Sequence, residues 1–236
     1  MSLLTIVQTV TERTGIPTPA TVMGSTDPQV IQLRSLLEEE GASLSRRGDW
    51  ESLTFEATHT TLAAEDQGAI ATIASNGYRH IKNETLWDRT DQLPVPLINS
   101  TAWQRLKATV SAAPRFRYRI RGGKLLMTPT PPASHTLAFE YVSKNWILGA
   151  DLVTYKSAFT LDTDTLLLDE PLLTLGLRWR WKKEHGLEYA EDFRDYEMQV
   201  ADFLGREGGK PVIALDNRGE RSRPGVIVPE YSWNLP

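Results

Sequence analysis

Four arginines occur at every second position of one short stretch of this sequence. Arg115, Arg117, Arg119 and Arg121 lie in the stretch RFRYRIR. Successive side chains of a β-strand point to opposite faces, so a strand here would collect the guanidinium groups on one face and apolar side chains on the other. Guanidinium groups form paired hydrogen bonds with carboxylates and phosphates. The spacing therefore predicts a local anion-binding surface, which we call the arginine strand.

Three roles are open for the arginine strand. Its charges could deter edge-to-edge aggregation of an exposed strand. They could contact the phosphates of a nucleic acid, which would make the protein a nucleic-acid-binding module. They could also pair with an acidic surface on a neighbouring copy, and the last predicted helix supplies one with Glu191, Asp192 and Asp195. Only this third role uses the charge asymmetry between two segments of one chain, and we adopt it as the working hypothesis.

The other reactive residues form no catalytic or metal-binding pattern. His59, His80, His135 and His185 are not spaced like metal ligands, and the chain has neither cysteine nor a GxSxG or HExxH motif. Carboxylates one turn apart on the last helix could serve hydrolysis, but a solvated helix face is the simpler interpretation. We therefore expect no enzyme activity, no cofactor and no metal.

The cluster RWRWKKEHG mixes cationic and aromatic side chains, as surfaces that bind single-stranded nucleic acids do. On a helix, however, Trp179 and Trp181 would lie about 200° apart and could not form one stacking platform. Leu172, Leu175 and Trp179 would share a face. This arrangement favours a place for Trp179 in the core.

Composition limits what the whole chain can be. Its 236 residues suit one large domain or two small ones, and 40% hydrophobic with 24% charged residues is an ordinary globular balance. The net charge of −4 argues against a nucleic-acid surface that covers the whole protein. The absence of cysteine is consistent with folding in a reducing cytoplasm. No apolar run reaches membrane length, so we expect no membrane contact.

Periodicity and capping residues predict the elements that position these side chains. Asp27 and Pro28 fit the N-cap and first position of a helix, and Gly122 with Gly123 favours a tight hairpin after the arginine strand. The predicted helices cover 2–14, 28–47, 101–110, 169–186 and a last stretch that includes 189–203, and the predicted strands cover 52–62, 69–74, 77–86, 115–121, 124–129 and 135–148.

These elements predict an α+β fold. Residues 1–50 and 160–209 would form a helical portion built from the N- and C-terminal helices. Residues 51–159 would form an antiparallel β-rich middle portion. Residues 210–236 show no periodicity and predict an extended C-terminal arm.

The arm could be a disordered tail, but its composition favours a binding role. A purely solvated tail seldom carries so many large apolar side chains. Aromatic residues in an extended segment are typical of anchors on a partner's surface. The candidate anchors are Val226, Ile227, Val228, Tyr231, Trp233 and Leu235.

The order of these elements resembles that of the head-to-tail adaptors of tailed bacteriophages, especially the tubular tail protein A type of short-tailed phages. The stretch YRHIKNETLWDRT is similar to the family's strand that leads into a Trp-Asp turn, and PLINSTAWQRLKA to the proline-rich loop and tryptophan-bearing helix that follow. The segment from LLLDEPLL to YEMQV resembles the last two helices with a Gly-Leu-x-Tyr turn between them. The resemblance covers nearly the whole chain.

This resemblance implies a structural protein of the virion, made in the host cytoplasm and placed at the head–tail junction. Such adaptors form a homo-oligomeric ring, commonly of twelve copies, that joins the portal protein to the tail nozzle or tail tube. DNA passes through the channel without sequence-specific binding. By analogy, residues 210–236 would bind the portal.

Overall fold

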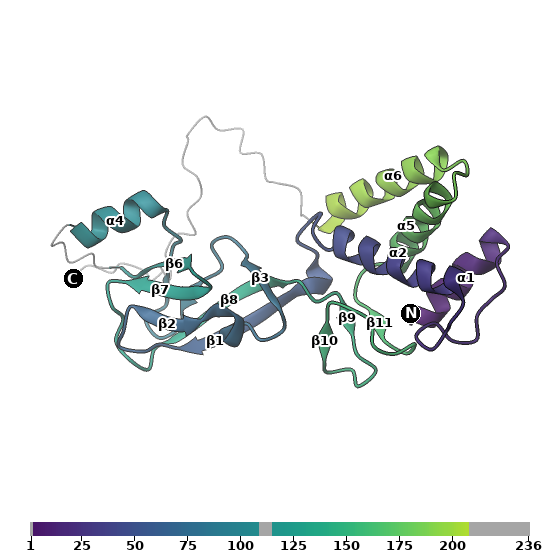
Figure 1. Ribbon diagram of the computed structural model, residues 1–236. Coiled ribbons are helices and arrows are strands. Elements are labelled where there is room, and N and C mark those ends of the chain that lie inside the picture. Colours follow the sequence, from purple (N-terminus) through teal and green to yellow (C-terminus); the bar gives the residue numbers. More distant parts are fainter. Residues whose placement is uncertain (1, 109–114, 208–236) are drawn as a thin grey trace, which may run out of the picture.

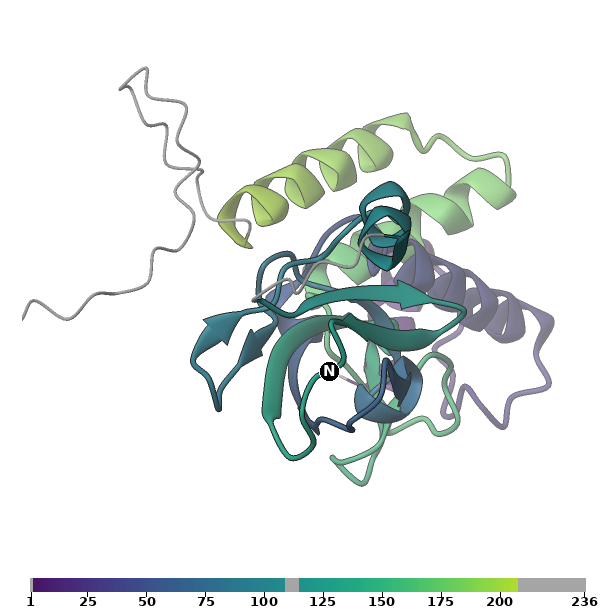
Figure 2. The same ribbon diagram turned by 90° about the vertical axis from the view of Figure 1, so that its left-hand side faces the viewer.

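The computed structural model describes residues 2–108 and 115–207, and within them it confirms the predicted α+β class (Figure 1). Helices α1, α2, α5 and α6 gather at one end of an elongated molecule, while α4 and the larger sheets occupy the other. Figure 2, seen from the strand end, places α4 and the sheets in front of these helices. The predicted arm, residues 210–236, lies outside the described residues.

The element bounds agree with most of the sequence predictions. The helices in the described ranges are α1 (Leu3–Thr14), α2 (Pro28–Leu44), the 3-10 turn η1 (Glu51–Leu53), α3 (Ile70–Ile73), α4 (Ser100–Ala108), α5 (Glu170–Glu184) and α6 (Ala190–Glu207). The strands there are β1 (Thr54–Thr60), β2 (Asp66–Ala69), β3 (Tyr78–Ile81), β4 (Trp87–Asp88), β5 (Leu93–Pro94), β6 (Arg117–Arg121), β7 (Lys124–Thr128), β8 (Thr136–Ser143), β9 (Ile147–Leu148), β10 (Tyr155–Lys156) and β11 (Thr165–Leu166). None of these helices has both the length and the hydrophobicity that a membrane span requires.

Capping residues start the helices where the sequence predicts. The carboxylate of Asp27 accepts a hydrogen bond from the N–H of Gln29, and Pro28 occupies the first turn of α2. Asp169 accepts from the N–H of Leu172 in the same way at the start of α5. These caps satisfy N–H groups that have no partner inside the helix.

A buried polar contact joins three of the helices. Glu40 of α2 has no exposed surface and binds Nε of Arg180 from α5 at 2.5 Å. The hydroxyl of Tyr196 from α6 donates to the other carboxylate oxygen of Glu40. Burial and the neighbouring Glu40 carboxylate raise the pKa of Tyr196, so the hydroxyl remains a donor. The contact fixes how α2, α5 and α6 pack together.

The central sheet is built around β8. This strand pairs antiparallel with β1 from Thr54↔Val142 to Thr60↔Thr136. Its other edge pairs with β3 and β4, and β4 pairs with β5. A second sheet has the order β2-β7-β6, and a third, small sheet has the order β10-β9-β11.

The predicted hairpin after the arginine strand is confirmed. Strands β6 and β7 pair in register from Arg117↔Thr128 to Arg121↔Lys124. Gly122 and Gly123 have φ angles of 59° and 72°, a region that glycine enters without steric cost.

Three of the predicted strands are wrong in extent. The strand predicted over 135–148 breaks after Ser143, and Ile147–Leu148 pairs separately as β9 in the small sheet. Residues 69–74 are not a strand: β2 ends at Ala69, where the N–H of Ile70 donates to Gly123 O, and the chain continues into the short helix α3. The β-branched residues there signal burial more than strand pairing, because Ile70 enters the core. The strand predicted over 77–86 stops at Ile81, since a turn follows in which Glu84 has a φ of 64°.

Two hydrophobic clusters form the core of the described residues. One lies among the β-strands, and the other lies mainly among the helices. Trp146, Ile147 and Phe159 belong to the helical cluster, although the sequence placed them in the β-rich portion over 51–159. The small sheet therefore packs on the helices and connects the two portions.

Candidate assembly surfaces

The arginine strand has the predicted alternation. The side chain of Tyr118 is only 3% exposed, in the core of the β portion, and the flanking Phe116 and Ile120 pack against the same cluster. The arginines point away from this core: Arg115 and Arg121 are exposed, and the two between them are half-buried. Strand geometry thus separates the apolar and cationic rows, as the sequence indicated.

The cations of the arginine strand are largely unneutralised. Arg119 donates to the Ser100 hydroxyl of α4 at 2.7 Å. No carboxylate among residues 2–108 and 115–207 lies within ion-pair distance of Arg115, Arg117 or Arg121. Clustered like charges repel one another, so this surface favours an anionic partner.

The outer edge of β6 is partly covered by the segment before α4. The N–H of Tyr118 donates to Pro96 O at 3.1 Å, and the N–H of Ile98 donates to Tyr118 O at 3.1 Å. This pairing occupies the backbone groups to which another strand could add. Protection of a bare edge is therefore a weak explanation for the arginines.

A groove of about 390 Å³ lies beside the start of β6. Its lining residues are Glu84, Leu86, Pro94, Val95, Pro96, Ile98, Arg115 and Arg117. The lining is mainly apolar, and both arginines belong to the arginine strand. The groove therefore adds a hydrophobic contact surface to the cationic one.

Of the three acidic residues predicted to form a surface on α6, two lack an ion-pair partner among the described residues and one is buried and paired. Glu191 is exposed and Asp195 is half-buried, and no cation in the described ranges lies within ion-pair distance of either. Asp192 differs from the prediction: it is buried and binds Arg178 and Lys182 of α5, the latter at 2.5 Å. These cations lower the pKa of Asp192 despite its burial, which alone would raise it.

Asp192 therefore belongs to the contact between α5 and α6 and is removed from the candidate interface. The sequence did not reveal this because Arg178 and Lys182 lie on a different helix, and only the antiparallel pairing of α5 with α6 brings them to Asp192. Glu191 and Asp195 stay as candidates.

The arginine strand and the acidic start of α6 lie at opposite ends of the molecule. Figure 1 shows β6 toward one end of the long axis and the turn between α5 and α6 at the other. The two charged surfaces therefore cannot neutralise each other within one copy, whereas a contact with a second copy would bring them together.

The structure also brings together Asp88, Asp91 and His135, which the sequence does not associate. Nδ1 of His135 lies 2.8 Å from Asp88 Oδ2 and 3.7 Å from Asp91 Oδ2. Three such groups could hold a cation, since their ligand atoms lie within 4.8 Å of one another. However, Asp88 Oδ1 already accepts from the N–H groups of Thr90 and Asp91, and its Oδ2 binds the imidazole. The hydrogen-bonding groups of Asp88 are thus already used, and the cluster links β4 to the residue before β8.

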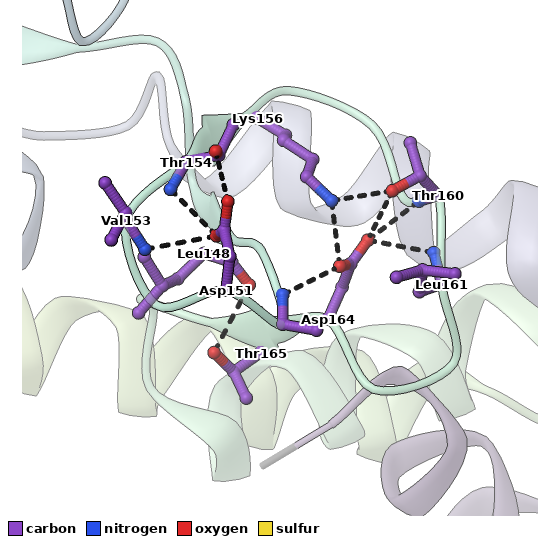
Figure 3. Close-up of polar contacts among 10 residues, drawn as sticks. Leu148, Asp151, Val153, Thr154, Lys156, Thr160, Leu161, Asp164 and Thr165 are labelled. Carbon is purple, nitrogen blue, oxygen red and sulfur yellow. Dashed lines mark hydrogen bonds and ion pairs between the residues drawn. The ribbon is translucent and has the colours of Figure 1, made fainter.

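Two aspartates organise the loops of the small sheet (Figure 3). Oδ1 of Asp164 binds Nζ of Lys156 at 2.9 Å and the N–H of Ala150, and Oδ2 accepts from the N–H groups of Thr160 and Leu161. Burial alone would raise the pKa of Asp164, but these donors lower it to about 2.

Asp151 holds the adjacent loop in the same way. The hydroxyl and N–H of Thr154 and the N–H of Val153 donate to its carboxylate and lower its pKa to about 2. Leu152 between them has a φ of 57°, and both Leu152 and Val153 are exposed. These aspartates build loop structure and do not converge on a pocket.

The aromatic residues of α5 are structural. Trp179 and Trp181 are each 8% exposed, which confirms the predicted place of Trp179 in the core. The ring of Trp179 packs edge-on against Phe193 of α6, with a centroid distance of 5.0 Å. Neither indole is free to stack on nucleic-acid bases.

A scan against models of known protein families and a search of curated proteins found no match to this chain.

Proposed function

We propose that this protein is a virion structural protein, a head-to-tail adaptor whose copies form a ring that joins the portal to the tail and lets DNA pass through. The observation that carries the proposal is a pair of unlike charged surfaces at opposite ends of the molecule, the arginine strand and Glu191 with Asp195 of α6. Neither surface has an ion-pair partner among the described residues. A ring requires this kind of heterologous contact, in which one patch of each copy meets a different patch of the next.

Two further points support an assembly role. The titratable groups of the described residues that lie close together, such as Asp88 with His135 and Asp192 with Lys182, are bound to each other. The resemblance of the sequence to phage adaptors supplies the identity of the assembly, with a portal on one side and a tail nozzle or tail tube on the other.

The test is to mix the purified protein with its portal and examine the product by negative-stain electron microscopy and native mass spectrometry. We expect a ring, of twelve copies by analogy, that caps the portal. A protein that stays monomeric with its portal would contradict the proposal. If the monomer instead bound DNA with a steep dependence on salt concentration, the arginine strand would be a nucleic-acid surface.

A further inference from the structure

We infer that the groove beside the arginine strand receives the turn between α5 and α6 of the next copy. This inference rests on the proposed function and identifies the contact that would close the ring. The groove offers an apolar lining with Arg115 and Arg117, and the turn offers apolar side chains with carboxylates. The occupant is therefore a second copy of this chain.

The turn is held in a rigid conformation. Gly186 has a φ of 65°, its N–H donates to Lys183 O, and the N–H of Leu187 donates to Lys182 O. This pair of bonds is the Schellman arrangement that ends many helices. A rigid turn loses little conformational entropy when it binds, which favours its use as an inserting element.

The turn also exposes the side chains that the groove would cover. In a Schellman turn the residue in the position of Leu187 usually packs on the residue in the position of Lys182. Here the amino group of Lys182 binds Asp192, and Leu187 stays 48% exposed. Tyr189 and Phe193, one helical turn apart, are each 38% exposed beside it. Exposed apolar side chains that gather in one place indicate a contact surface.

The charges of the turn and the volume of the groove are both compatible with insertion of the turn. Residues 187–191 carry two acidic side chains, Glu188 and Glu191, and no basic one. The groove carries Arg115 and Arg117 against a single acidic residue, Glu84. Its volume of about 390 Å³ equals that of roughly a dozen water molecules, which leaves room for one or two large side chains.

The absence of cysteine from the chain permits a direct test by disulfide cross-linking. We would introduce Ile98→Cys in the groove and Leu187→Cys in the turn of one protein and oxidise it mildly in the presence of portal. Disulfides require Cβ atoms about 3.5–4.5 Å apart. We expect a ladder of covalent multimers on a non-reducing gel, since each copy would link to two neighbours. Each single-cysteine variant can form dimers at most.

A matched control places the second cysteine elsewhere on α6. Met198 is 60% exposed and Leu187 is 48% exposed, so the variant with Ile98→Cys and Met198→Cys is at least as accessible to oxidant but should give no ladder. If rings form by native mass spectrometry yet the 98/187 variant links no better than this control, the docking inference is wrong and the adaptor function stands. If no ring forms with the portal, the proposed function itself fails.

A charge exchange tests the same contact without cysteine. Arg117→Glu should weaken the association of neighbouring copies by roughly tenfold or more, because it places like charges together. Adding Glu191→Arg to that variant should restore association, because position 117 is then acidic and position 191 basic, so the two side chains attract again at every contact. Analytical ultracentrifugation measures both effects. A double variant no better than Arg117→Glu alone would overturn the assignment of Glu191 to the groove.

Discussion

Gly41 of α2 lies directly against the indole of Trp146, so that a Cβ on the glycine would be 2.2 Å from Cη2 of the ring. Trp146 follows the central strand β8 and is 1% exposed in the helical cluster. Its ring packs edge-on against Phe159 at a centroid distance of 5.4 Å. The contact anchors the end of the β portion on the helices and needs a residue without a side chain at position 41.

We predict that Gly41→Ala destabilises the protein by about 1–3 kcal/mol, because overpacking a filled core forces the backbone or the ring to move. Gly205→Ala in α6 is the matched control. A Cβ there meets no atom within 4 Å, and alanine favours a helix over glycine by up to about 1 kcal/mol. Urea unfolding measures both variants. Equal effects of the two substitutions would contradict the contact with Trp146.

We predict that Asp164→Asn destabilises the protein by about 2–4 kcal/mol. Both carboxylate oxygens accept hydrogen bonds, so an amide NH₂ group would face donors on one side or the other. Asp27→Asn is the control, because asparagine and aspartate cap helices about equally well. Thermal unfolding compares the two variants, and a small effect at both positions would argue against the network in Figure 3.

The hydrogen bonds to Asp164 also predict that the stability of the folded protein falls in acid. The pKa of Asp164 is lowered to about 2, below the ordinary value of 3.8. A lowered folded-state pKa contributes stability that is present above the unfolded value and is lost as the pH falls toward the folded value. We expect the wild-type protein to lose stability between about pH 4 and pH 2, and the Asp164→Asn variant to lose less over this range. If the free energy of unfolding fell equally with pH in the two proteins, Asp164 would not be the source of the acid sensitivity.

The pKa of His135 should lie above its ordinary value. The hydrogen bond to Asp88 raises its pKa, and the resulting stability is fully present below the unfolded value of 6.5 and is lost as the pH rises through the folded value. In Asp88→Asn, NMR titration should show the pKa of His135 return toward its ordinary value, while the amide oxygen can still accept from Thr90. An unchanged titration would exclude the ion pair.

We predict that Arg117→Glu with Arg119→Glu prevents ring assembly and leaves the monomer folded. The reversed charges would face the acidic surface of the next copy, whereas neither arginine has a carboxylate partner among the described residues. Arg13→Glu with Lys144→Glu is the control, since both side chains are exposed and neither belongs to β6 or to the groove beside it. Native mass spectrometry with circular dichroism separates assembly from folding. Normal rings from the β6 variant would discard the role of the arginine strand.

Deletion of residues 212–236 tests the arm. Both hydrophobic clusters lie within the described residues, so we expect the shortened protein to fold. If Tyr231 and Trp233 anchor the arm on the portal, the deletion should abolish capture in a pull-down with purified portal, since each fully buried anchor contributes about 1.5–3 kcal/mol. Retained capture would remove the arm from the portal contact.

The features that depend only on residues close together in the chain could be predicted from the sequence alone. The cap at Asp27, the proline that follows it, the glycine pair at 122–123 and the alternation around Tyr118 all act over a few residues, and the structure confirms them. The region over 69–86 was harder to predict, because buried β-branched residues are compatible with a strand or a short helix until the core is assembled.

Tertiary structure alone decided which charges are free and which are paired. Asp192 and Glu191 are adjacent in the sequence, yet Asp192 binds Arg178 and Lys182 while Glu191 stays exposed. His135 likewise meets Asp88 across 47 positions of the chain. Residue type sets the charge that a side chain carries, but the packing of helices and strands sets its partners, because electrostatic pairing depends on distances in space.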